Sequence, residues 1–228
     1  MDIQSKIILI AGPTASGKSN FAVKLAKKVN GEIINADSMQ VYKQLKILTA
    51  RPNKKDQKNI IHHLYGVIDV KKNFSTGQWL KLAIKKIKEI RRRKKTPILV
   101  GGTGLYFQSI ISGLVKIPNI PLKLRSKVRL KQKKEGQIKF YKKLLKLDKK
   151  VKDKFDPNDI QRSIRAFEIK LYTNISMYDW LSKTKSVFNE NEFFKIYIDF
   201  NREELIKRIS FRTVKMLQNG AIDEVKKF

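Results

Sequence analysis

The stretch that decides the fold is Gly12-Pro13-Thr14-Ala15-Ser16-Gly17-Lys18-Ser19. It has the form G-x-x-x-x-G-K-[ST], the pattern of a phosphate-binding loop. An apolar run, Lys6 to Ala11, leads directly into it, and a helical pattern with apolar residues on one side follows it. Because this motif is specific only between a strand and a helix, the flanking sequence supports it and predicts a phosphate-binding loop.

Each residue type in the loop has a physical role. Gly12 and Gly17 let the backbone curl, so that successive N–H groups point inward at an anion. The following helix adds the partial positive charge of its N-terminus. Lys18 adds a full charge, and the hydroxyl of Ser19 is a ligand for Mg²⁺. The motif thus indicates a phosphate or diphosphate, but it leaves open which molecule carries it.

Composition restricts the class of protein and points to a polyanionic partner. The chain has 228 residues, 41% of them hydrophobic, and no cysteine, which fits a cytoplasmic protein without disulfides. No apolar run approaches the length of a membrane span. The formal net charge is +31, and residues 116–155 hold 16 Lys and Arg against three acidic residues. Such a field attracts nucleic acid, and the binding should depend steeply on salt.

Alternating strand and helix patterns predict an α/β fold, a P-loop NTPase-like parallel sheet with helices on both faces. Right-handed crossovers place the loops after the strands on one rim, where ligands bind in open α/β sheets. Asp37 and Thr103 should therefore lie near the phosphate loop. The predicted strands are 6–11, 32–36, 97–100 and 194–199, and the longest predicted helix is 74–95.

A change in composition near residue 116 predicts a second domain. We expect residues 1–115 and 193–228 to form the core domain, and residues 116–192 to form a basic helical insertion that binds nucleic acid. One helix should begin after Asp156-Pro157-Asn158-Asp159, with Asp156 and Asp159 as caps. Its apolar stripe is predicted as Ile160, Ile164, Phe167 and Leu171.

The residues alone leave several functions open. Asp37 can act as a general base, or it can cap its own turn through the backbone. His62 and His63 are neighbours whose side chains point apart, which favours hydrogen-bonded structural histidines over a metal site. A small-molecule kinase of the nucleoside-monophosphate or shikimate type is an alternative, with Arg202, Arg208 and Arg212 as a phosphate lid.

Several further motifs occur in order along the chain. They are Asp37-Ser38-Met39-Gln40-Val41-Tyr42, Thr49-Ala50-Arg51-Pro52, His62-His63-Leu64, Leu99-Val100-Gly101-Gly102-Thr103-Gly104-Leu105-Tyr106, and Asp156 to Asp159 with Gln161-Arg162 and Arg165-Ala166. Together with the phosphate loop, these motifs resemble the bacterial tRNA isopentenyltransferase family.

The resemblance implies transfer of a dimethylallyl group from dimethylallyl diphosphate to N6 of an adenosine. That adenosine lies 3′ of the anticodon in tRNAs that read codons starting with U. Asp37 then resembles the base, Thr103 the residue that positions the reacting centre, and Lys18 and Ser19 with Mg²⁺ the holders of the diphosphate. ATP is expected only as a mimic at the loop. Contacts to the tRNA are implied for Asp37, Ser38, Met39, Gln40, Thr103, Gln161, Arg162, Ser163, Ile164 and Arg165.

Some positions depart from the family pattern. Ser19 replaces a frequent Thr, Arg51 stands where Lys is usual, and 173–176 lacks the common Thr-Gly-Lys-Pro turn. The family continues with a segment that supplies a diphosphate-contacting arginine, so we expect this chain to be C-terminally truncated. An inactive RNA-binding fragment is therefore a further alternative. We expect a monomer.

Overall fold

The computed structural model describes residues 3–228, which divide into two compact units. The first unit holds the sheet and comprises residues 3–113 and 186–228, and the second comprises residues 114–185. The elements of the first unit are β1 Ile7–Ala11, α1 Lys18–Lys28, β2 Gly31–Asn35, α2 Lys54–Gln57, β3 His62–His63, α3 Thr76–Arg92, β4 Thr96–Gly101, α4 Gly104–Ser112, η2 Glu190–Glu192, β5 Phe193–Tyr197, α9 Arg202–Gln218 and α10 Ala221–Lys226.

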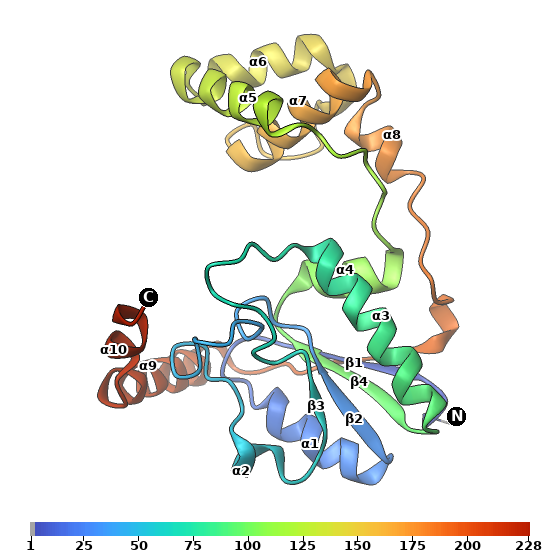
Figure 1. The fold of residues 1–228 in the computed structure, drawn as a ribbon, viewed down its shortest axis with the longest axis vertical. Coiled ribbons are helices and arrows are strands. Elements are labelled where there is room, and N and C mark those ends of the chain that lie inside the picture. The colour runs from blue at the N-terminus through green and yellow to red at the C-terminus, as the bar shows by residue number, and fades with distance from the viewer. Residues whose placement is uncertain (1–2) are drawn as a thin grey trace. The chain divides into compact units, whose positions relative to one another are not determined.

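The sheet has five strands in the order β3-β2-β4-β1-β5, and every neighbouring pair is parallel (Figure 1). Side chains alternate between its two faces because successive residues of a strand point to opposite sides. Ile7 and Leu9 pack with α3 and α4, whereas Ile8 and Ile10 pack with α1. The predicted α/β class with helices on both faces is confirmed.

The strand β3 was missed in the sequence, where four strands were expected. Two residues are too few for a periodic pattern, and contacts to β2 hold them in place. Ile33 and Ile34 pair with His62 and His63, and the Asn35 side chain donates to the Leu64 carbonyl at 3.1 Å. The two histidines thus form the edge of the sheet.

A buried carboxylate, Glu32, attaches this edge to the end of α3. It is 1% exposed and lies 2.7 Å from His63 Nε2, 2.7 Å from Arg93 Nη2 and 3.3 Å from Lys95 Nζ. Burial opposes ionisation, but the hydrogen bonds from Arg93, His63 and Lys95 prevail and lower the pKa of Glu32 to about 2. The structural, hydrogen-bonded role predicted for His63 is confirmed, and His62 Nδ1 lies 2.8 Å from the Ile60 carbonyl oxygen.

The second unit is a helical bundle around Phe140, Leu144 and Val151, with Ala166 and Phe167 from a later helix. Residues 186–192 were predicted to belong to the insertion, but the structure places them with the sheet. Ser186 Oγ donates to the Ile110 carbonyl at 2.9 Å, and Phe188 is part of the sheet's core. The elements are α5 Leu122–Glu135, α6 Gln137–Leu147, η1 Lys149–Val151, α7 Ile160–Thr173 and α8 Met177–Leu181.

The helix α7 begins where predicted, but its buried face differs from the predicted stripe. Asp159 caps it by accepting from the Arg162 N–H at 2.9 Å, whereas Asp156 accepts from Asn158 one turn earlier. Ile160 and Leu171 are exposed. The residues buried along α7 are Ser163, Ala166, Phe167, Glu168 and Ile169. The reason is that buried polar partners, and not hydrophobicity alone, set the orientation of this helix.

Acid should weaken the fold through Glu32. A carboxyl whose folded pKa lies near 2 stabilises the folded state above the unfolded pKa of 4.5, and this contribution disappears as the pH falls towards 2. Glu32→Gln should therefore lower the free energy of unfolding at neutral pH, and its difference from wild type should shrink between about pH 5 and about pH 2.5. Urea denaturation followed by circular dichroism measures this.

The matched control is Glu89→Gln, which removes a partly exposed carboxylate paired with Lys86 within α3. Surface pairs contribute little, so this variant should stay close to wild type. A Glu32→Gln difference that is independent of pH would contradict the role given to the ionised carboxylate.

Candidate active site

The phosphate loop connects β1 to α1 in the predicted strand–loop–helix arrangement. Gly17 has φ +86° and begins the helix, a conformation that residues with a Cβ rarely adopt. A Cβ on Gly12 would lie 2.9 Å from the Ile198 carbonyl oxygen, so a side chain there would force the loop away from the end of β5. Pro13 accepts a hydrogen bond from Lys18 Nζ at 2.7 Å. The loop therefore holds its own lysine over the cradle.

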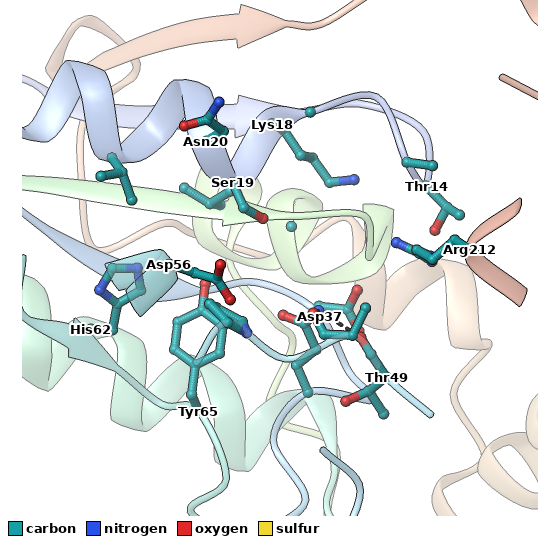
Figure 2. A pocket seen from close by; sticks show the side chains of 18 of the residues that line it. Thr14, Lys18, Ser19, Asn20, Asp37, Thr49, Asp56, His62, Tyr65 and Arg212 are labelled. Atoms are coloured by element: carbon teal, nitrogen blue, oxygen red, sulfur yellow. Dashed lines mark hydrogen bonds between the residues drawn. The ribbon is translucent and has the colours of Figure 1, made fainter. Parts of the chain in front are cut away.

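A cavity of about 570 Å³ opens beside this loop, and all its lining residues belong to the first unit. Thr14, Ala15, Gly17, Lys18 and Ser19 line one part of it. In Figure 2, Thr14 and Arg212 lie at one end of the cavity, and His62 and Tyr65 lie at the other. The remaining lining residues are Asn20, Val23, Asp37, Gln40, Thr49, Ala50, Pro52, Lys55, Asp56, Lys58, Val100 and Gly101.

Cationic groups gather at the loop end of this cavity. Burial lowers the pKa of Lys18, the charge of Arg212 lowers it further, and the charge of Asp37 acts in the opposite direction. Two cations this close repel each other unless an anion lies between them. Ser16, also in the loop, is 6% exposed, and its hydroxyl has no hydrogen-bond partner within residues 3–228. These features suit a bound polyanion.

Asp37 follows β2 at the rim of the sheet, as predicted. Its backbone N–H donates to Asn35 Oδ1 at 2.9 Å, and its own Oδ1 accepts from the Met39 N–H at 2.9 Å. The second contact is the turn-capping interaction that was the alternative to catalysis. One carboxylate has more than two acceptor sites, so capping leaves acceptor capacity on Asp37, which lines the cavity.

Thr103 contacts both chain neighbours of Asp37 because the chain stays hydrogen-bonded past the ends of β2 and β4. The Ala36 N–H donates to Val100 and the Thr103 N–H donates to Ala36, at 2.8 and 3.2 Å. Thr103 Oγ1 accepts from the Ser38 N–H at 2.9 Å and donates to Ser38 Oγ at 3.3 Å. The structure thus joins Thr103 to the predicted 37–40 stretch, in which Met39 is 50% exposed.

Gln40 is held by the segment across from the phosphate loop. Its Nε2 donates to the Thr49 carbonyl at 2.8 Å and lies 3.4 Å from the Ala50 carbonyl oxygen. Both carbonyls belong to the Thr49-Ala50-Arg51-Pro52 motif of the sequence. The motif therefore forms a wall of the cavity.

The residues Gln161 to Arg165 lie on the first turns of α7, in the second unit. Gln161 and Arg162 are exposed. Ser163 is fully buried and accepts from Gln137 Nε2 at 2.9 Å, so its side chain takes part in packing. Arg165 Nη1 lies 3.2 Å from the buried carboxylate of Glu168.

Three features of the cavity were not assigned from sequence. Arg212 was expected there only for a kinase, and a diphosphate-contacting arginine was expected in the family segment beyond this chain. Tyr65 lines the cavity, and burial together with the charge of Asp37 raises its pKa. Asp56 also lines it. Arg208 and Arg212 are four residues apart, which is typical of two side chains on the same face of a helix. The spacing does not say which part of the protein that face contacts.

The acidic and histidine side chains of the described residues do not form a cluster typical of a metal site. Within residues 3–228, no group of three or more His, Cys, Asp or Glu is placed to hold a metal ion. A magnesium ion here would therefore depend on isolated oxygen donors and on the ligand's own oxygens.

In the same described part of the chain, every helix is too short or too polar to cross a bilayer.

Comparisons with known proteins show the family of this chain. The family model described as IPP transferase matches residues 40–228. A tRNA dimethylallyltransferase of Pelagibacter ubique is 75% identical over 228 residues, which is 100% of this chain and 73% of that protein. The chain belongs to the IPP transferase family. It is accordingly a transferase, and the predicted resemblance is confirmed.

More distant members of the IPP transferase family also match this chain over nearly its whole length. A tRNA dimethylallyltransferase of Rickettsia massiliae is 45% identical over 223 residues, 97% of this chain and 61% of that protein. The crystal structure of a eukaryotic dimethylallyltransferase acting on tRNA has a TM-score of 0.82 and 32% identity, and covers 97% of this chain. This chain spans 55% of that structure's length.

Removal of Arg212 should weaken binding of pyrophosphate. A hydrogen bond to a charged group contributes about 1.5–3 kcal/mol, so Arg212→Ala should bind Mg²⁺-pyrophosphate about tenfold or more weakly. Isothermal titration calorimetry measures the affinity. Arg208→Ala is the control, because the Arg208 guanidinium lies over the Phe200 ring at 4.1 Å. Equal losses in both variants would show a general effect of positive charge.

Proposed function

We propose that this chain transfers a dimethylallyl group from dimethylallyl diphosphate to N6 of the adenosine 3′ of the anticodon, in tRNAs that read codons starting with U. The observation that supports this best is that one cavity is lined by the cations Lys18 and Arg212 and by the carboxylate of Asp37. Prenyl transfer needs both: cations for the leaving diphosphate and a base for the attacking amine.

The loop end of the cavity serves the diphosphate. As the bond between the prenyl carbon and the diphosphate oxygen breaks, negative charge accumulates on the leaving group. Lys18 is already held by its hydrogen bond to the Pro13 carbonyl, and together with Arg212 it would stabilise that charge. This is the role that the predicted diphosphate-binding residues Gly12 to Ser19 would take together.

The Asp37 end serves the acceptor. The N6 lone pair attacks the prenyl carbon, a carbon–nitrogen bond forms, and the bond to the diphosphate oxygen breaks. The amine becomes acidic only as it attacks, and its proton passes to the Asp37 carboxylate. The Asn35 and Met39 contacts fix that carboxylate at the rim.

Magnesium fits the donors present, and we propose it as the cofactor. The Ser19 hydroxyl and the carboxylates of Asp37 and Asp56 line the same cavity. Mg²⁺ prefers oxygen ligands and usually takes only one or two from protein, with the remainder from phosphates and water. Ser19 would hold the ion, which neutralises diphosphate charge when bound.

The tRNA would be bound by contacts of two kinds. Ser38, Met39, Gln40 and Thr103 would contact the target adenosine, which must leave its stack at a cost of a few kcal/mol. The basic second unit, through the exposed Gln161 and Arg162 and the neighbouring Ile164 and Arg165, would meet the anticodon stem-loop. Sequence-specific RNA recognition favours such unpaired loops. A tRNA substrate also implies a cytoplasmic location, and we propose a monomer.

The alternatives lead to different outcomes in one experiment. Purified chain is incubated with labelled dimethylallyl diphosphate and undermodified tRNA, and label in the tRNA is counted. We expect label in tRNAs that read codons starting with U, and none when the target adenosine is replaced. ATP-dependent phosphorylation of a small molecule without labelled tRNA would favour the kinase. Binding of tRNA without any transfer would indicate an inactive RNA-binding fragment.

The role of Asp37 can be separated from its turn cap. Asn at this position still accepts a hydrogen bond from the Met39 N–H, but it cannot take a proton. Asp37→Asn should therefore lower kcat by about a hundredfold or more, as general bases contribute 10²–10⁴-fold. Its affinity for tRNA should stay within a few fold, measured by filter binding. Near-normal turnover in Asp37→Asn would exclude Asp37 as the base.

A further inference from the structure

A carboxylate near the end of the described chain holds the cavity wall across from the phosphate loop. Glu224, on α10, accepts hydrogen bonds from three successive backbone N–H groups. They belong to Lys46 at 2.7 Å, Ile47 at 2.9 and 3.0 Å, and Leu48 at 3.0 Å. Burial acts to raise the pKa of Glu224, but the three amides outweigh it and lower the pKa. The Glu224 carboxylate is therefore ionised where it accepts from the amides of residues 46–48.

The three bonded amides belong to the first residues of the segment 46–52, which is folded tightly on itself. The Ala50 N–H donates to Ile47, and the Arg51 N–H donates to Lys46, both at 3.0 Å. Arg51 Nη1 donates to the Tyr42 carbonyl at 3.0 Å. Its guanidinium occupies the space where a Cβ on Gly66 would lie. A compact segment of this kind moves as one body, so fixing its first three amides fixes the rest.

The other end of this segment lines the cavity and holds a side chain there. Thr49, Ala50 and Pro52 are lining residues, and the carbonyls of Thr49 and Ala50 accept from Gln40 Nε2. The Gln40 carbonyl accepts in turn from the Gly66 N–H at 2.9 Å. The chain of contacts thus runs from Glu224 through the wall to the Gln40 amide.

We propose that Glu224 is a positioning residue for the adenine that accepts the prenyl group. Its carboxylate fixes the segment 46–52, and the Thr49 and Ala50 carbonyls of that segment in turn fix the amide of Gln40. This rests on the proposed function, in which Gln40 meets the target adenosine. The diphosphate lies on the Lys18 side of the cavity. Loss of Glu224 should therefore impair use of tRNA far more than binding of the diphosphate.

The test compares Glu224→Gln with Asp223→Asn. Gln keeps the size of the side chain, but its NH₂ group cannot accept from an amide, so part of the clamp is lost. Asp223 carries the same charge in the first turn of the same helix, so its replacement controls for the effect of charge on α10. Three readouts are needed: hydrogen exchange of the 46–48 amides, steady-state kinetics with tRNA, and affinity for Mg²⁺-pyrophosphate.

In Glu224→Gln, we expect the amides of residues 46–48 to exchange about tenfold faster, since hydrogen bonds to a charged acceptor are lost. The KM for tRNA should rise about five- to tenfold, with pyrophosphate affinity within about twofold of wild type. Asp223→Asn should match wild type in all three. Glu224→Asp, one methylene shorter, should show an intermediate rise in exchange and in KM.

Three outcomes would overturn the proposal. The first is unchanged exchange at residues 46–48, and the second is faster exchange with unchanged tRNA kinetics. The third is a parallel loss of pyrophosphate affinity, tRNA use and melting temperature, which would make Glu224 a general structural residue. If wild type transfers no label to tRNA, the proposed function fails by itself. Exchange needs no turnover, so it still tests whether Glu224 holds the wall.

Discussion

The site depends on one constraint: β2 and β4 remain hydrogen-bonded beyond their last strand residues. The Ala36 N–H donates to Val100, and the Thr103 N–H donates back to Ala36. A Cβ on Gly101 would overlap the Ala36 backbone, so only glycine lets these chains approach so closely. Since the strands are parallel, both chains leave the sheet at the same rim. Thr103 consequently contacts Ala36 and Ser38, the two chain neighbours of Asp37.

This arrangement separates opposite charges within one cavity. Burial lowers the pKa of Lys18, the charge of Asp37 opposes this shift, and the charge of Arg212 adds to it, so an anion bound between the two cations would offset an existing cost. Asp37 remains outside the cradle because Asn35 and Met39 hold it at the rim.

The sequence predicted those parts of the structure that are determined by residues close together in the chain. The phosphate loop, four of the strands and the Asp159 cap depend on periodicity and on short motifs, which are visible without a structure. The edge strand β3 depends on a salt-bridge cluster around Glu32, and the buried face of α7 depends on Ser163 meeting Gln137 and on Glu168 meeting Arg125. These contacts join residues far apart in the chain, so no local pattern contained them.

The same limit applies to Arg212, which the sequence placed at a phosphate only for the kinase alternative, and to Glu224, to which the sequence assigned no role. Both lie in an amphipathic stretch whose charges look like an ordinary solvated face. Arg212 of α9 lines the cavity, whereas Glu224 of α10 accepts hydrogen bonds from the amides of residues 46–48, just before the wall formed by Thr49 and Ala50. Arg212 lies at the end of the cavity near Thr14, and Glu224 holds the segment whose carbonyls accept from Gln40. Because two consecutive helices carry these two side chains, a shift of the helix pair would displace the Arg212 guanidinium and the support of the wall at Thr49 and Ala50 together.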